Sequence, residues 1–528
     1  MQGFRVGGLC SVLGCVAAMA NVATPAAAAF ARHYNLMIST SPTHNVTLNN
    51  GVFAPTGAQP MLNENDLVNA LANGAVEVTT GNGYGGRGTG DLLVEAGFTW
   101  TGTNALTLDA YHSVVVDQPI VNSGTGALTI VDNDKGMGGY LSFGSSGSIT
   151  ILNLSNVLDI DGTQYTLVGD ISTLAYDIET VNRKGSYALA NSYDASADGT
   201  YHNPPIGAFW GVLEGLGNTI SNLSVSTTYS AGLFSGIGGP SEYGTILDLG
   251  LINANVSGGN DRTGGNAAGV LAALATGMIR NCYSTGAVEA RGRGASAGGL
   301  VGGASNDSFE NAYSMAVVTE KGTGGYAGGL SGTSSGGNVI ESSFATGAVS
   351  GGVDSFVGGL IGRNFTTPIR KSFATGSVSV GKWDGVTPSP TAAGGLIGFN
   401  FSSSIANSYA EGNVSGGSHA VVGGLVGLGS ESTLQKLYAT GAPTVGKRGL
   451  AGGFIGKDRR GYAKDGYWDT TTSGTMNGTG TGQKKGVTGL TTTQLQSGLP
   501  KGLDSNVWGE DSAINNGLPY LINNPPPQ

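Results

Sequence analysis

Apolar and polar residues alternate in many short runs along the chain, and turns rich in Gly, Asn and Ser separate these runs. In one such run, Leu106, Leu108 and Ala110 would lie on one face of a strand. The residues between them, Thr107 and Asp109, would lie on the other face. A period of two residues is typical of β-strands with one buried face. The pattern therefore predicts an all-β protein made of many short strands.

A longer repeat dominates the middle of the chain, in which two glycines precede two mostly apolar residues and a further glycine. A second pattern runs in step with it: an aromatic residue, Ser or Ala, Thr, Gly, any residue and Val, as in 344–349 and 373–378. The first pattern recurs at spacings of 30, 30, 36, 29 and 29 residues, with apolar anchors at Leu300, Leu330, Leu360, Leu396, Leu425 and Phe454. Repetition at this period indicates a repeat architecture.

Each repeat holds two or three short β runs, none long enough to form a stable sheet alone. About 30 residues fit one turn of a solenoid with about three strands and three corners. Stacking equivalent strands about 4.8 Å apart would align the apolar anchors in one column and the aromatic residues in a ladder. We attribute the paired glycines to the corners, where they would permit positive φ and close backbone approach. The extra residues around 382–388 predict a surface loop between two turns.

Composition excludes several other classes. Gly accounts for 94 of the 528 residues, while hydrophobic residues make up 39% and charged residues 11%. A disordered chain would combine low hydrophobicity with high net charge, and collagen would carry Gly at every third position with abundant Pro. The formal net charge is -10, and the densest basic cluster is only Lys457, Arg459 and Arg460. We therefore expect no nucleic-acid partner.

The N-terminus has the features of an export signal. Arg5 precedes an apolar stretch over 6–22, and small residues follow up to Ala31. We predict a signal peptide over 1–31, with a lipoprotein signal ending at Cys15 as the alternative. The mature chain would then be extracellular or on the cell surface.

The predicted mature chain contains a single cysteine, Cys282, so it can form no internal disulfide. The repeat position of Cys282 predicts a buried, small, apolar side chain, and a reactive thiol is the alternative. No later segment has the 18 or so unbroken apolar residues of a membrane helix. The nearest candidate, 266–279, is short and interrupted by glycines. We therefore expect no transmembrane segment in the mature chain.

No motif in the sequence predicts a catalytic, cofactor-binding or metal-binding residue. The five histidines do not form the paired motif of a metallopeptidase, and the Gly-Gly-Asn-Asp segment at 258–261 is a single, incomplete calcium-type repeat. β-Helical polysaccharide-degrading enzymes need converging carboxylates. Here the candidate acids lie in turns where Asp commonly caps its own backbone, and none is expected to stack on another in the adjacent turn. These candidates are Asp132, Asp134, Asp159, Asp161 and Asp261.

The two recurring patterns resemble the GLUG motif over about 230–456. That motif occurs in large bacterial surface proteins and in non-catalytic parts of IgA-cleaving metallopeptidases. The upstream runs 69–76, 106–111 and 127–130 are similar to filamentous haemagglutinin-type exoproteins. The resemblance implies a right-handed parallel β-helix and an outer-membrane secretion partner.

These observations divide the chain into four segments. We predict a signal peptide over 1–31, a haemagglutinin-like β-helix over 32–205, a GLUG-repeat solenoid over 206–460, and a C-terminal cap with a Pro-rich tail over 461–528. The residues expected to cover the last turn of the solenoid are Trp468, Trp508, Leu518, Tyr520 and Leu521.

The function expected from this resemblance is adhesion without catalysis, through weak multivalent contacts with host or bacterial surface glycans or proteins. A polysaccharide-degrading β-helix and a structural matrix or biofilm scaffold are the alternatives. The 381–390 loop with Trp383 is either a contact site or an unselected insertion in a tolerant turn.

Overall fold

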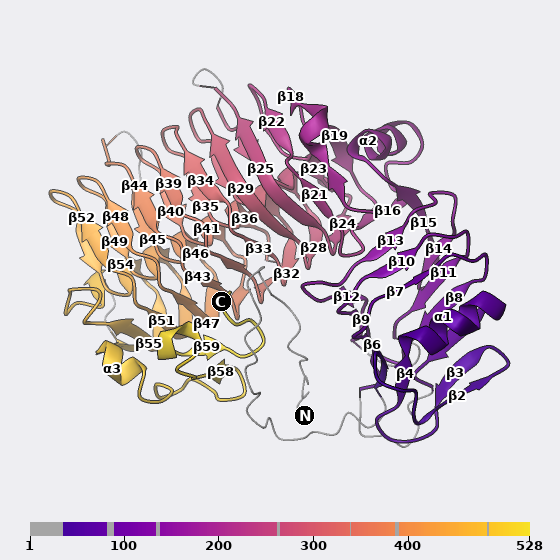
Figure 1. The fold of residues 1–528 in the computed structure, drawn as a ribbon. Coiled ribbons are helices and arrows are strands. Elements are labelled where there is room, and N and C mark those ends of the chain that lie inside the picture. The colour runs from indigo at the N-terminus through magenta and orange to yellow at the C-terminus, as the bar shows by residue number, and fades with distance from the viewer. Residues whose placement is uncertain are drawn as a thin grey trace.

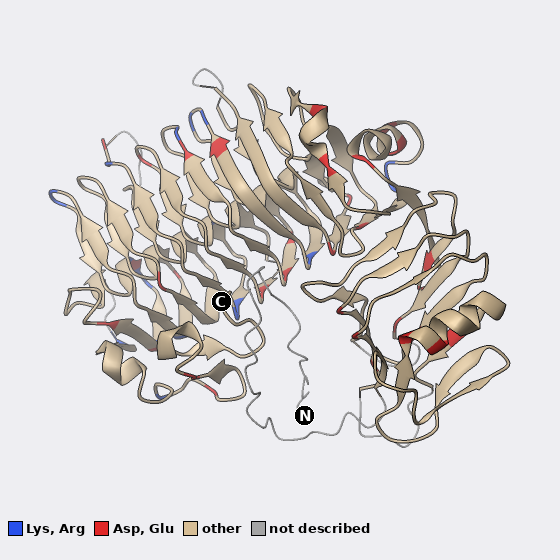
Figure 2. Cartoon of the chain, viewed as in Figure 1, with Lys and Arg blue, Asp and Glu red and all other residues tan. Residues whose placement is uncertain are grey.

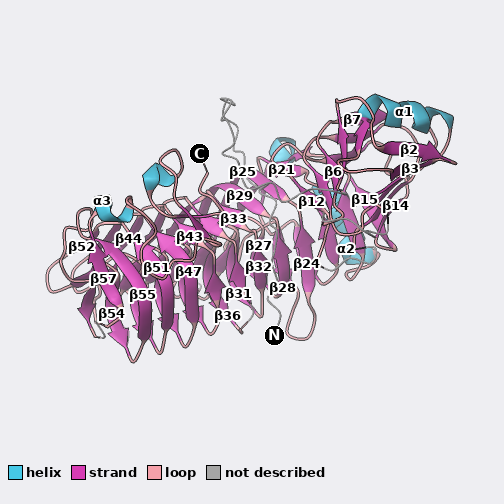
Figure 3. Cartoon of the chain, turned by 90° about the horizontal axis from the view of Figure 1, so that it is seen from below, coloured by secondary structure: helices cyan, strands magenta, loops and turns pink. Residues whose placement is uncertain are grey.

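The computed structural model of the chain describes residues 35–81, 89–133, 138–260, 264–337, 339–385, 390–482 and 485–527. These residues form an elongated parallel β-solenoid of about 14 turns with few helices (Figure 1, Figure 3). The predicted fold is confirmed. The predicted signal peptide, Asp134, Asp261 and residues 386–389 of the predicted loop lie outside the described residues.

The N-terminal part of the solenoid, from β1 to β14, is called the first coil. It has three sides of mostly parallel strands. As the sequence predicts, Leu106, Leu108 and Ala110 are fully buried, whereas Thr107 and Asp109 are partly exposed. One side contains β4 (Met61–Asn63), β1 (Leu36–Ser39), β6 (Leu92–Val94), β9 (Val114–Val116) and β12 (Ser142–Phe143), and the second β7 (Phe98–Trp100), β10 (Ile120–Asn122) and β13 (Ile149–Ile151). The third contains β2 (Val46–Asn49), β3 (Val52–Pro55), β5 (Val76–Thr79), β8 (Leu106–Asp109), β11 (Leu128–Val131) and β14 (Leu158–Ile160).

Two helices lie where the sequence pattern predicts only strands. α1 (Glu64–Asn73) buries Leu67 and Leu71, which are one helical turn apart and therefore share a face. α2 (Ile171–Thr180) begins at Asp170, whose carboxylate accepts a hydrogen bond from a backbone N–H of the first turn. Both helices lie on the outside of the stacked turns (Figure 1). Residues 69–73 of the 69–76 run therefore belong to a helix, and strand β5 begins at Val76.

The rest of the solenoid, from β15 to β57, is called the second coil. It is built largely from the predicted repeats. Each full turn gives one strand to sheet 1, one to sheet 2 and up to three short segments to a third side. Sheet 1 contains β26 (Ala267–Ala268), β30 (Ser296–Gly298), β35 (Tyr326–Gly328), β40 (Phe356–Gly358), β45 (Ala392–Gly394), β49 (Val421–Gly423) and β53 (Leu450–Gly452). Sheet 2 contains β19 (Ile206–Phe209), β23 (Phe234–Ile237), β27 (Ala272–Ala275), β31 (Val301–Ser305), β36 (Ser331–Ser335), β41 (Ile361–Phe365), β46 (Ile397–Phe401), β50 (Val426–Ser430), β54 (Ile455–Arg459) and β56 (Thr479–Thr481).

The third side of the second coil runs in three rows of parallel pairs. The first row contains β15 (Thr163–Val168), β16 (Ser186–Leu189), β20 (Val212–Glu214), β24 (Gly244–Leu247), β28 (Gly277–Arg280), β32 (Ser308–Glu310), β37 (Ile340–Glu341) and β42 (Ile369–Arg370). The second contains β17 (Tyr193–Asp194), β21 (Thr219–Ser221), β25 (Gly250–Gly258), β29 (Tyr283–Ala290), β33 (Tyr313–Ser314), β38 (Phe344–Ala345) and β43 (Phe373–Ala374). The third contains β18 (Thr200–Tyr201), β22 (Ser224–Ser226), β34 (Val317–Glu320), β39 (Val349–Gly351), β44 (Val378–Val380), β48 (Val414–Gly416) and β52 (Pro443–Val445).

In the last turns the first two rows merge into longer strands. These are β47 (Ser404–Ala410), β51 (Thr433–Ala439), β55 (Tyr462–Asp469) and β57 (Val487–Leu490). Register follows the sequence repeat, because Val301 pairs with Ser331, Ser331 with Ile361, and Ile361 with Ile397. The 30- and 36-residue steps predicted from the sequence are thus the lengths of single turns.

The paired glycines serve close packing between sheets 1 and 2. A Cβ atom added to Gly298 would lie 1.9 Å from the Val301 carbonyl oxygen and 2.7 Å from Cα of Ser331 in the next turn. A Cβ atom on Gly302, the further glycine of the same repeat, would lie 2.6 Å from the backbone nitrogen of Ala268. Neither glycine has positive φ. The predicted close approach is confirmed, but the predicted positive φ at these glycines was wrong.

Left-handed backbone instead occurs at a column of residues two positions before each aromatic residue of the predicted ladder and before Tyr467, which pairs in register with Tyr438. Their φ angles lie between 47° and 56°, a region that Asn tolerates best among residues with a side chain. The Asn311 side chain donates a hydrogen bond to Asn281 Oδ1 (3.2 Å), so neighbouring corners also support each other. The column contains Asn281, Asn311, Ser342, Lys371, Asn407, Lys436 and Asp465.

The predicted aromatic ladder is present on the outside of the third side. Successive ring centroids are 4.7 to 4.9 Å apart, and the ring planes differ by 2 to 6°. This spacing equals that of neighbouring strands, so each ring stacks on the equivalent ring of the next turn. The stacked rings are Tyr283, Tyr313, Phe344, Phe373, Tyr409 and Tyr438.

The C-terminal segment folds back over this ladder. Trp508 packs on Tyr409 and Tyr438 with ring centroids 6.1 and 5.8 Å away. The Asn524 side chain donates to the Lys371 carbonyl oxygen (3.0 Å). Figure 1 shows this segment, with α3 (Thr492–Leu495), β58 (Trp508–Gly509) and β59 (Tyr520–Leu521), running beside β51 and β47.

The predicted C-terminal cap therefore lies in a different position from the one expected. Trp508, Leu518 and Leu521 cover the side of the solenoid over the ladder instead of its last turn. Trp468 belongs to the main interior core.

The two coils meet at a bend, which is visible in Figure 1 between the purple and magenta turns. Their interiors form separate hydrophobic clusters, and Leu167, Ala188, Ala190 and Leu216 at the bend belong to the cluster of the first coil. Backbone hydrogen bonds connect the coils, from Ile149 N–H to the Leu216 carbonyl (2.9 Å) and from Ile151 N–H to the Ala190 carbonyl. The coils are therefore joined by strand-type contacts.

Candidate binding surface

An aromatic surface lies on the outside of sheets 1 and 2. Tyr326 and Phe356 pair as neighbours in sheet 1, and Phe365 and Phe401 pair as neighbours in sheet 2. The inward positions of these strands belong to the main core, so the aromatic side chains take the outward positions. We define the aromatic surface as Tyr326, Phe356, Arg363, Phe365, Phe399 and Phe401.

Ring contacts connect the surface across turns and across the two sheets. The Phe365 and Phe401 rings stack with centroids 4.7 Å apart and planes 8° apart. Phe399 lies 6.3 Å from Phe401 and 5.1 Å from Phe356, and the Phe356 centroid is 6.2 Å from that of Tyr326. Phe365 is 38% exposed, and the other members are half-buried. The surface therefore presents part of each ring to solvent, while Phe356 and Phe399 also pack on the buried Ala392, Val421 and Leu428.

Arg363 gives the aromatic surface a positive charge. Its guanidinium lies 5.5 Å from the Tyr326 ring centroid and 5.8 Å from that of Phe365, within cation–π range. Lys457 and Arg459 occupy the same outward columns of sheet 2, two turns beyond Phe399 and Phe401. No carboxylate in the described part of the chain forms an ion pair with any of these three cations. The cations therefore remain available to an anion from outside.

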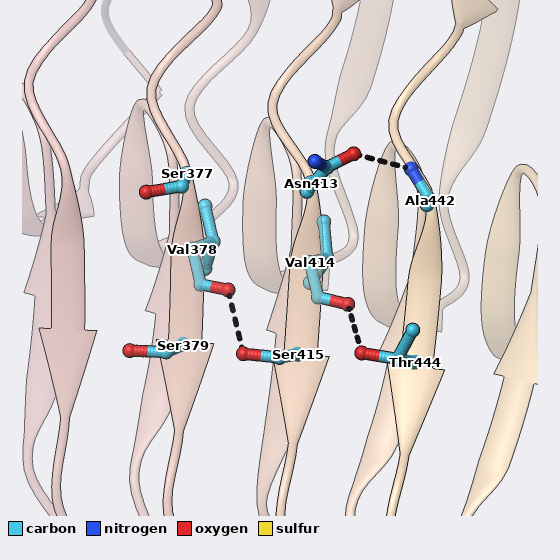
Figure 4. A pocket seen from close by; sticks show the side chains of 8 residues that line it. All are labelled: Ser377, Val378, Ser379, Asn413, Val414, Ser415, Ala442 and Thr444. Carbon is cyan, nitrogen blue, oxygen red and sulfur yellow. Dashed lines mark hydrogen bonds between the residues drawn. The ribbon is translucent and has the colours of Figure 1, made fainter. Parts of the chain in front are cut away.

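A shallow uncharged depression of about 310 Å³ lies on another outward face, formed by β44, β48 and β52 (Figure 4). Ser379, Ser415 and Thr444 take equivalent register positions and form an exposed hydroxyl row. The Ser415 and Thr444 hydroxyls donate to the Val378 and Val414 carbonyls of the preceding turn, both at 3.4 Å. These hydroxyls already bond within the sheet, so the depression offers weaker contacts than the aromatic surface.

The structure brings together two of the acids that the sequence analysis expects to be apart. The Asp132 backbone N–H donates to the Asp161 carboxylate (2.9 Å), across one turn of the first coil. The expectation that no two candidate acids stack on adjacent turns was therefore wrong. Asp132 also accepts from the Leu141 N–H (2.9 Å), and Asp159 accepts from the Gly162 N–H (2.8 Å). The three carboxylates thus act as backbone acceptors in turns.

A second group of charges lies at the bend and was not found from the sequence. Glu214 ends β20, Asp248 directly follows the neighbouring strand β24, and both are buried near the start of the second coil. The Arg280 guanidinium lies 4.5 Å from the Tyr140 ring centroid. Its Nε atom and Asp248 Oδ2 have no hydrogen-bond partner in the described part of the chain. The sequence pattern did not reveal this cluster, because the early repeats are irregularly spaced and Glu214 and Asp248 lie 34 residues apart.

Burial controls the protonation of these acids. Burial and then the charge of Asp161 raise the pKa of Asp132 to about 6. Burial raises the pKa of Glu214 and of Asp248, while the nearby positive charge of Arg280 opposes both shifts. The cluster therefore carries less negative charge than its composition suggests, because protonation reduces the electrostatic cost of burial.

Asp91, His112 and Ser113 have the composition of a catalytic triad without its geometry. His112 Nδ1 lies 2.7 Å from Asp91 Oδ1 and 3.0 Å from the Ser113 hydroxyl. A triad uses one ring nitrogen for the carboxylate and the other for the hydroxyl, whereas here both contacts involve Nδ1. Asp91 also accepts from the Ser113 N–H (3.1 Å). The group therefore stabilises a turn of the first coil.

Cys282 is fully buried in the main core, at the position occupied by Ala312 and Ser343 in the next turns. The prediction of a small buried side chain is confirmed, and burial raises the pKa of its thiol. In the predicted loop, the Trp383 N–H donates to the Ser418 carbonyl (3.0 Å), so the start of the loop pairs with the next turn.

Among the described residues, no helix is long and apolar enough to span a bilayer. No three His, Cys, Asp or Glu side chains in these ranges lie close enough together to hold a metal ion.

Comparison with known proteins supports the sequence resemblance in part. The family described as the GLUG motif matches residues 389–415, which include Phe399 and Phe401. Halomucin of Haloquadratum walsbyi is 34% identical over 143 residues, covering 26% of this chain and 1% of halomucin. The chain therefore spans a very small part of the length of this relative.

A solved structure, described as "a putative immunoglobulin A1 protease from Bacteroides ovatus", shares 20% identity and a TM-score of 0.36, covering 68% of this chain and 92% of its own. The filamentous haemagglutinin resemblance stays an expectation. The chain is thus a β-solenoid repeat protein that carries a GLUG motif and is similar to a segment of halomucin.

Proposed function

We propose that this protein is an extracellular adhesin that attaches to glycans on host or neighbouring cells and catalyses no reaction. The observation that carries the proposal is the aromatic surface, an outward group of five rings on a rigid stack of strands. Aromatic rings suit glycan recognition because the C–H face of a sugar ring is apolar while its hydroxyl edge is polar. The predicted signal peptide supports an extracellular location.

The architecture favours binding that is spread over a long face. Successive turns place equivalent positions at the strand spacing, so an extended ligand can contact several turns at once. Weak contacts of this kind add through multivalency. The proposal excludes catalysis because the three described candidate acids act as backbone acceptors in turns.

The test is binding of the mature chain, 32–528, to a glycan array and to host and sister cells, with turnover of the same glycans followed in parallel. We expect saturable binding without cleavage. The double variant Phe365→Ser and Phe401→Ser should lose most of this binding. The matched control is Tyr243→Ser, because Tyr243 is 63% exposed and lies outside the aromatic surface.

Cleavage of a bound glycan would overturn the proposal in favour of a polysaccharide-degrading enzyme. Absence of binding to any glycan or cell would support a structural scaffold instead. Equal loss of binding in the control variant would show that the aromatic surface is not the attachment site.

A further inference from the structure

We infer that the aromatic surface selects glycans that carry carboxylate groups, such as those built from acidic sugars. This inference rests on the proposed glycan-binding function and adds the chemical class of the ligand. It is carried by the position of Arg363 within the aromatic surface, and by Lys457 and Arg459 further along the same sheet.

The rings provide the contact for the sugar body. Phe365 and Phe401 stack at 4.7 Å with nearly parallel planes, and Phe365 is the most exposed member. Phe399 continues the surface towards sheet 1 through its contact with Phe356. Two or more sugar rings of an oligosaccharide can therefore lie along these turns with their apolar faces against the aromatic side chains.

Arg363 is placed to meet an acidic substituent at the edge of such a sugar. Tyr326 and Phe365 flank its guanidinium, and the Tyr326 hydroxyl is 3.5 Å from one terminal nitrogen. This support limits the rotamers of the side chain, and its other N–H groups donate no hydrogen bond within the described part of the chain. A guanidinium presents paired N–H groups that match the two oxygens of a carboxylate.

Further cations lie where a longer ligand would extend. Phe399 pairs in register with Arg363 on one side, and Lys457 lies two turns away on the other side. Neighbouring strands are about 4.8 Å apart, so these positive charges would meet different units of one chain. Asp458 takes the register position that Asn364 and Asn400 occupy in earlier turns, where both are buried. Its carboxylate is therefore directed away from this outward face.

This group of cations is unusual for the protein as a whole. The chain has 35 acidic and 25 basic residues and a formal net charge of -10, so its overall field repels anionic ligands. Three cations without a described carboxylate partner on one sheet face create a local exception. A neutral glycan would not need them.

The experiment compares carboxylated and neutral oligosaccharides of equal length, immobilised and titrated with the mature chain. Variants are Arg363→Gln, the double variant Lys457→Gln and Arg459→Gln, and the double variant Phe365→Ser and Phe401→Ser. The control is Lys447→Gln, which removes one exposed positive charge at a corner outside the aromatic surface. Circular dichroism and melting temperature verify that each variant folds.

We expect wild type to prefer the carboxylated ligand, and Arg363→Gln to weaken that binding by about tenfold or more. Neutral-ligand binding should change by less than about twofold in Arg363→Gln, and the preference should decrease as salt concentration rises. The phenylalanine variant should weaken the binding of both ligands.

Equal binding of neutral and carboxylated ligands by wild type would overturn the inference and leave glycan adhesion standing. The same would follow if Lys447→Gln weakened binding as much as Arg363→Gln. Failure of every oligosaccharide to bind, with cell attachment unchanged in the phenylalanine variant, would instead contradict the proposed function itself.

Discussion

At the scale of single residues, steric space decides where this chain tolerates a side chain. The GLUG glycines lie where two sheets approach closely enough for their backbones to touch, and ordinary sheet packing about 10 Å apart would leave room for side chains there. At Gly359 the obstacle is the next turn of the stack, because its Cβ would lie 2.0 Å from the carbonyl oxygen of the equivalent Gly395. Conformational freedom is required at the Asn-rich corners instead.

We therefore expect Gly359→Ala to destabilise the solenoid strongly, by about 3 kcal/mol or more, because backbone must move to admit the methyl group. The matched control is Gly236→Ala in β23, where an added Cβ meets nothing within 4 Å and φ is not positive. That change should stay within about 0.5 kcal/mol. Urea denaturation of both variants measures the difference, and equal midpoints would contradict the steric argument.

At the scale of elements, the C-terminal segment completes a hydrophobic cluster that the repeats leave open. Phe373, Tyr409 and Tyr438 are almost fully buried, whereas Tyr283 and Tyr313, nearer the N-terminal end of the ladder, are half-buried. The difference follows the reach of the C-terminal segment along the ladder. The Tyr438 hydroxyl also donates to the Pro519 carbonyl oxygen (2.7 Å), which ties the segment to the coil.

Replacing Trp508 with Ala should release this segment, at a cost of about 3 to 5 kcal/mol for a buried aromatic side chain. Limited proteolysis should then remove the region after 490 faster than in wild type, and binding of a hydrophobic dye should rise as the ladder becomes exposed. The control is Tyr462→Ala, because Tyr462 is 54% exposed in the last turns. Unchanged proteolysis in Trp508→Ala would show that the hydrogen bonds alone hold the segment.

At the scale of the whole molecule, two coils with separate cores share one continuous backbone framework and a buried group of charges. Asp132 contributes from the first coil, and Glu214, Asp248 and Arg280 contribute from the second. Acidic and basic residues elsewhere are sparse, with several at corners and edges of the stack (Figure 2). The joint between the coils is therefore one pH-sensitive part of the interior, and burial also raises the pKa of Asp307, Glu320 and Glu411 elsewhere in the second coil.

The direction of that sensitivity follows from the raised pKa values. A folded-state pKa above the unfolded value means that the folded form binds protons more tightly, so this contribution to stability is lost as pH rises. For Asp132, the rise from 3.8 to about 6 corresponds to about 3 kcal/mol at most, lost between about pH 4 and pH 6. Glu214 and Asp248 add to the loss in the same direction.

We expect Asp132→Asn and Asp248→Asn to lose less stability than wild type as pH rises from 4 to 8, since an amide does not ionise. Denaturation midpoints measured across this range test the slope, which is independent of any constant cost of the substitution. Asp504→Asn is the control, because Asp504 is a surface carboxylate whose pKa is lowered by hydrogen bonds from Asn506. If neither Asp132→Asn nor Asp248→Asn changed the dependence of stability on pH, the assignment of that dependence to this group of charges would be contradicted.

The repeats alone predict the solenoid, its turn length and its aromatic ladder, because strand spacing and turn length map a sequence period directly onto space. They also predict a buried Cys282. Surface residues such as Arg363, Phe399 and Phe401 vary between repeats, so their patterns carry no periodic signal. They stand out only after stacking shows which of them share an outward face.

By itself, the sequence determined the architecture of this protein, because short repeated units can bury their apolar faces only by stacking on one another. Tertiary structure alone decided the path of the C-terminal segment, the bend with its buried charges and the composition of the aromatic surface. Each depends on contacts between residues from different turns or from distant segments, and local periodicity does not encode such contacts. The candidate binding surface therefore belongs to the assembled stack.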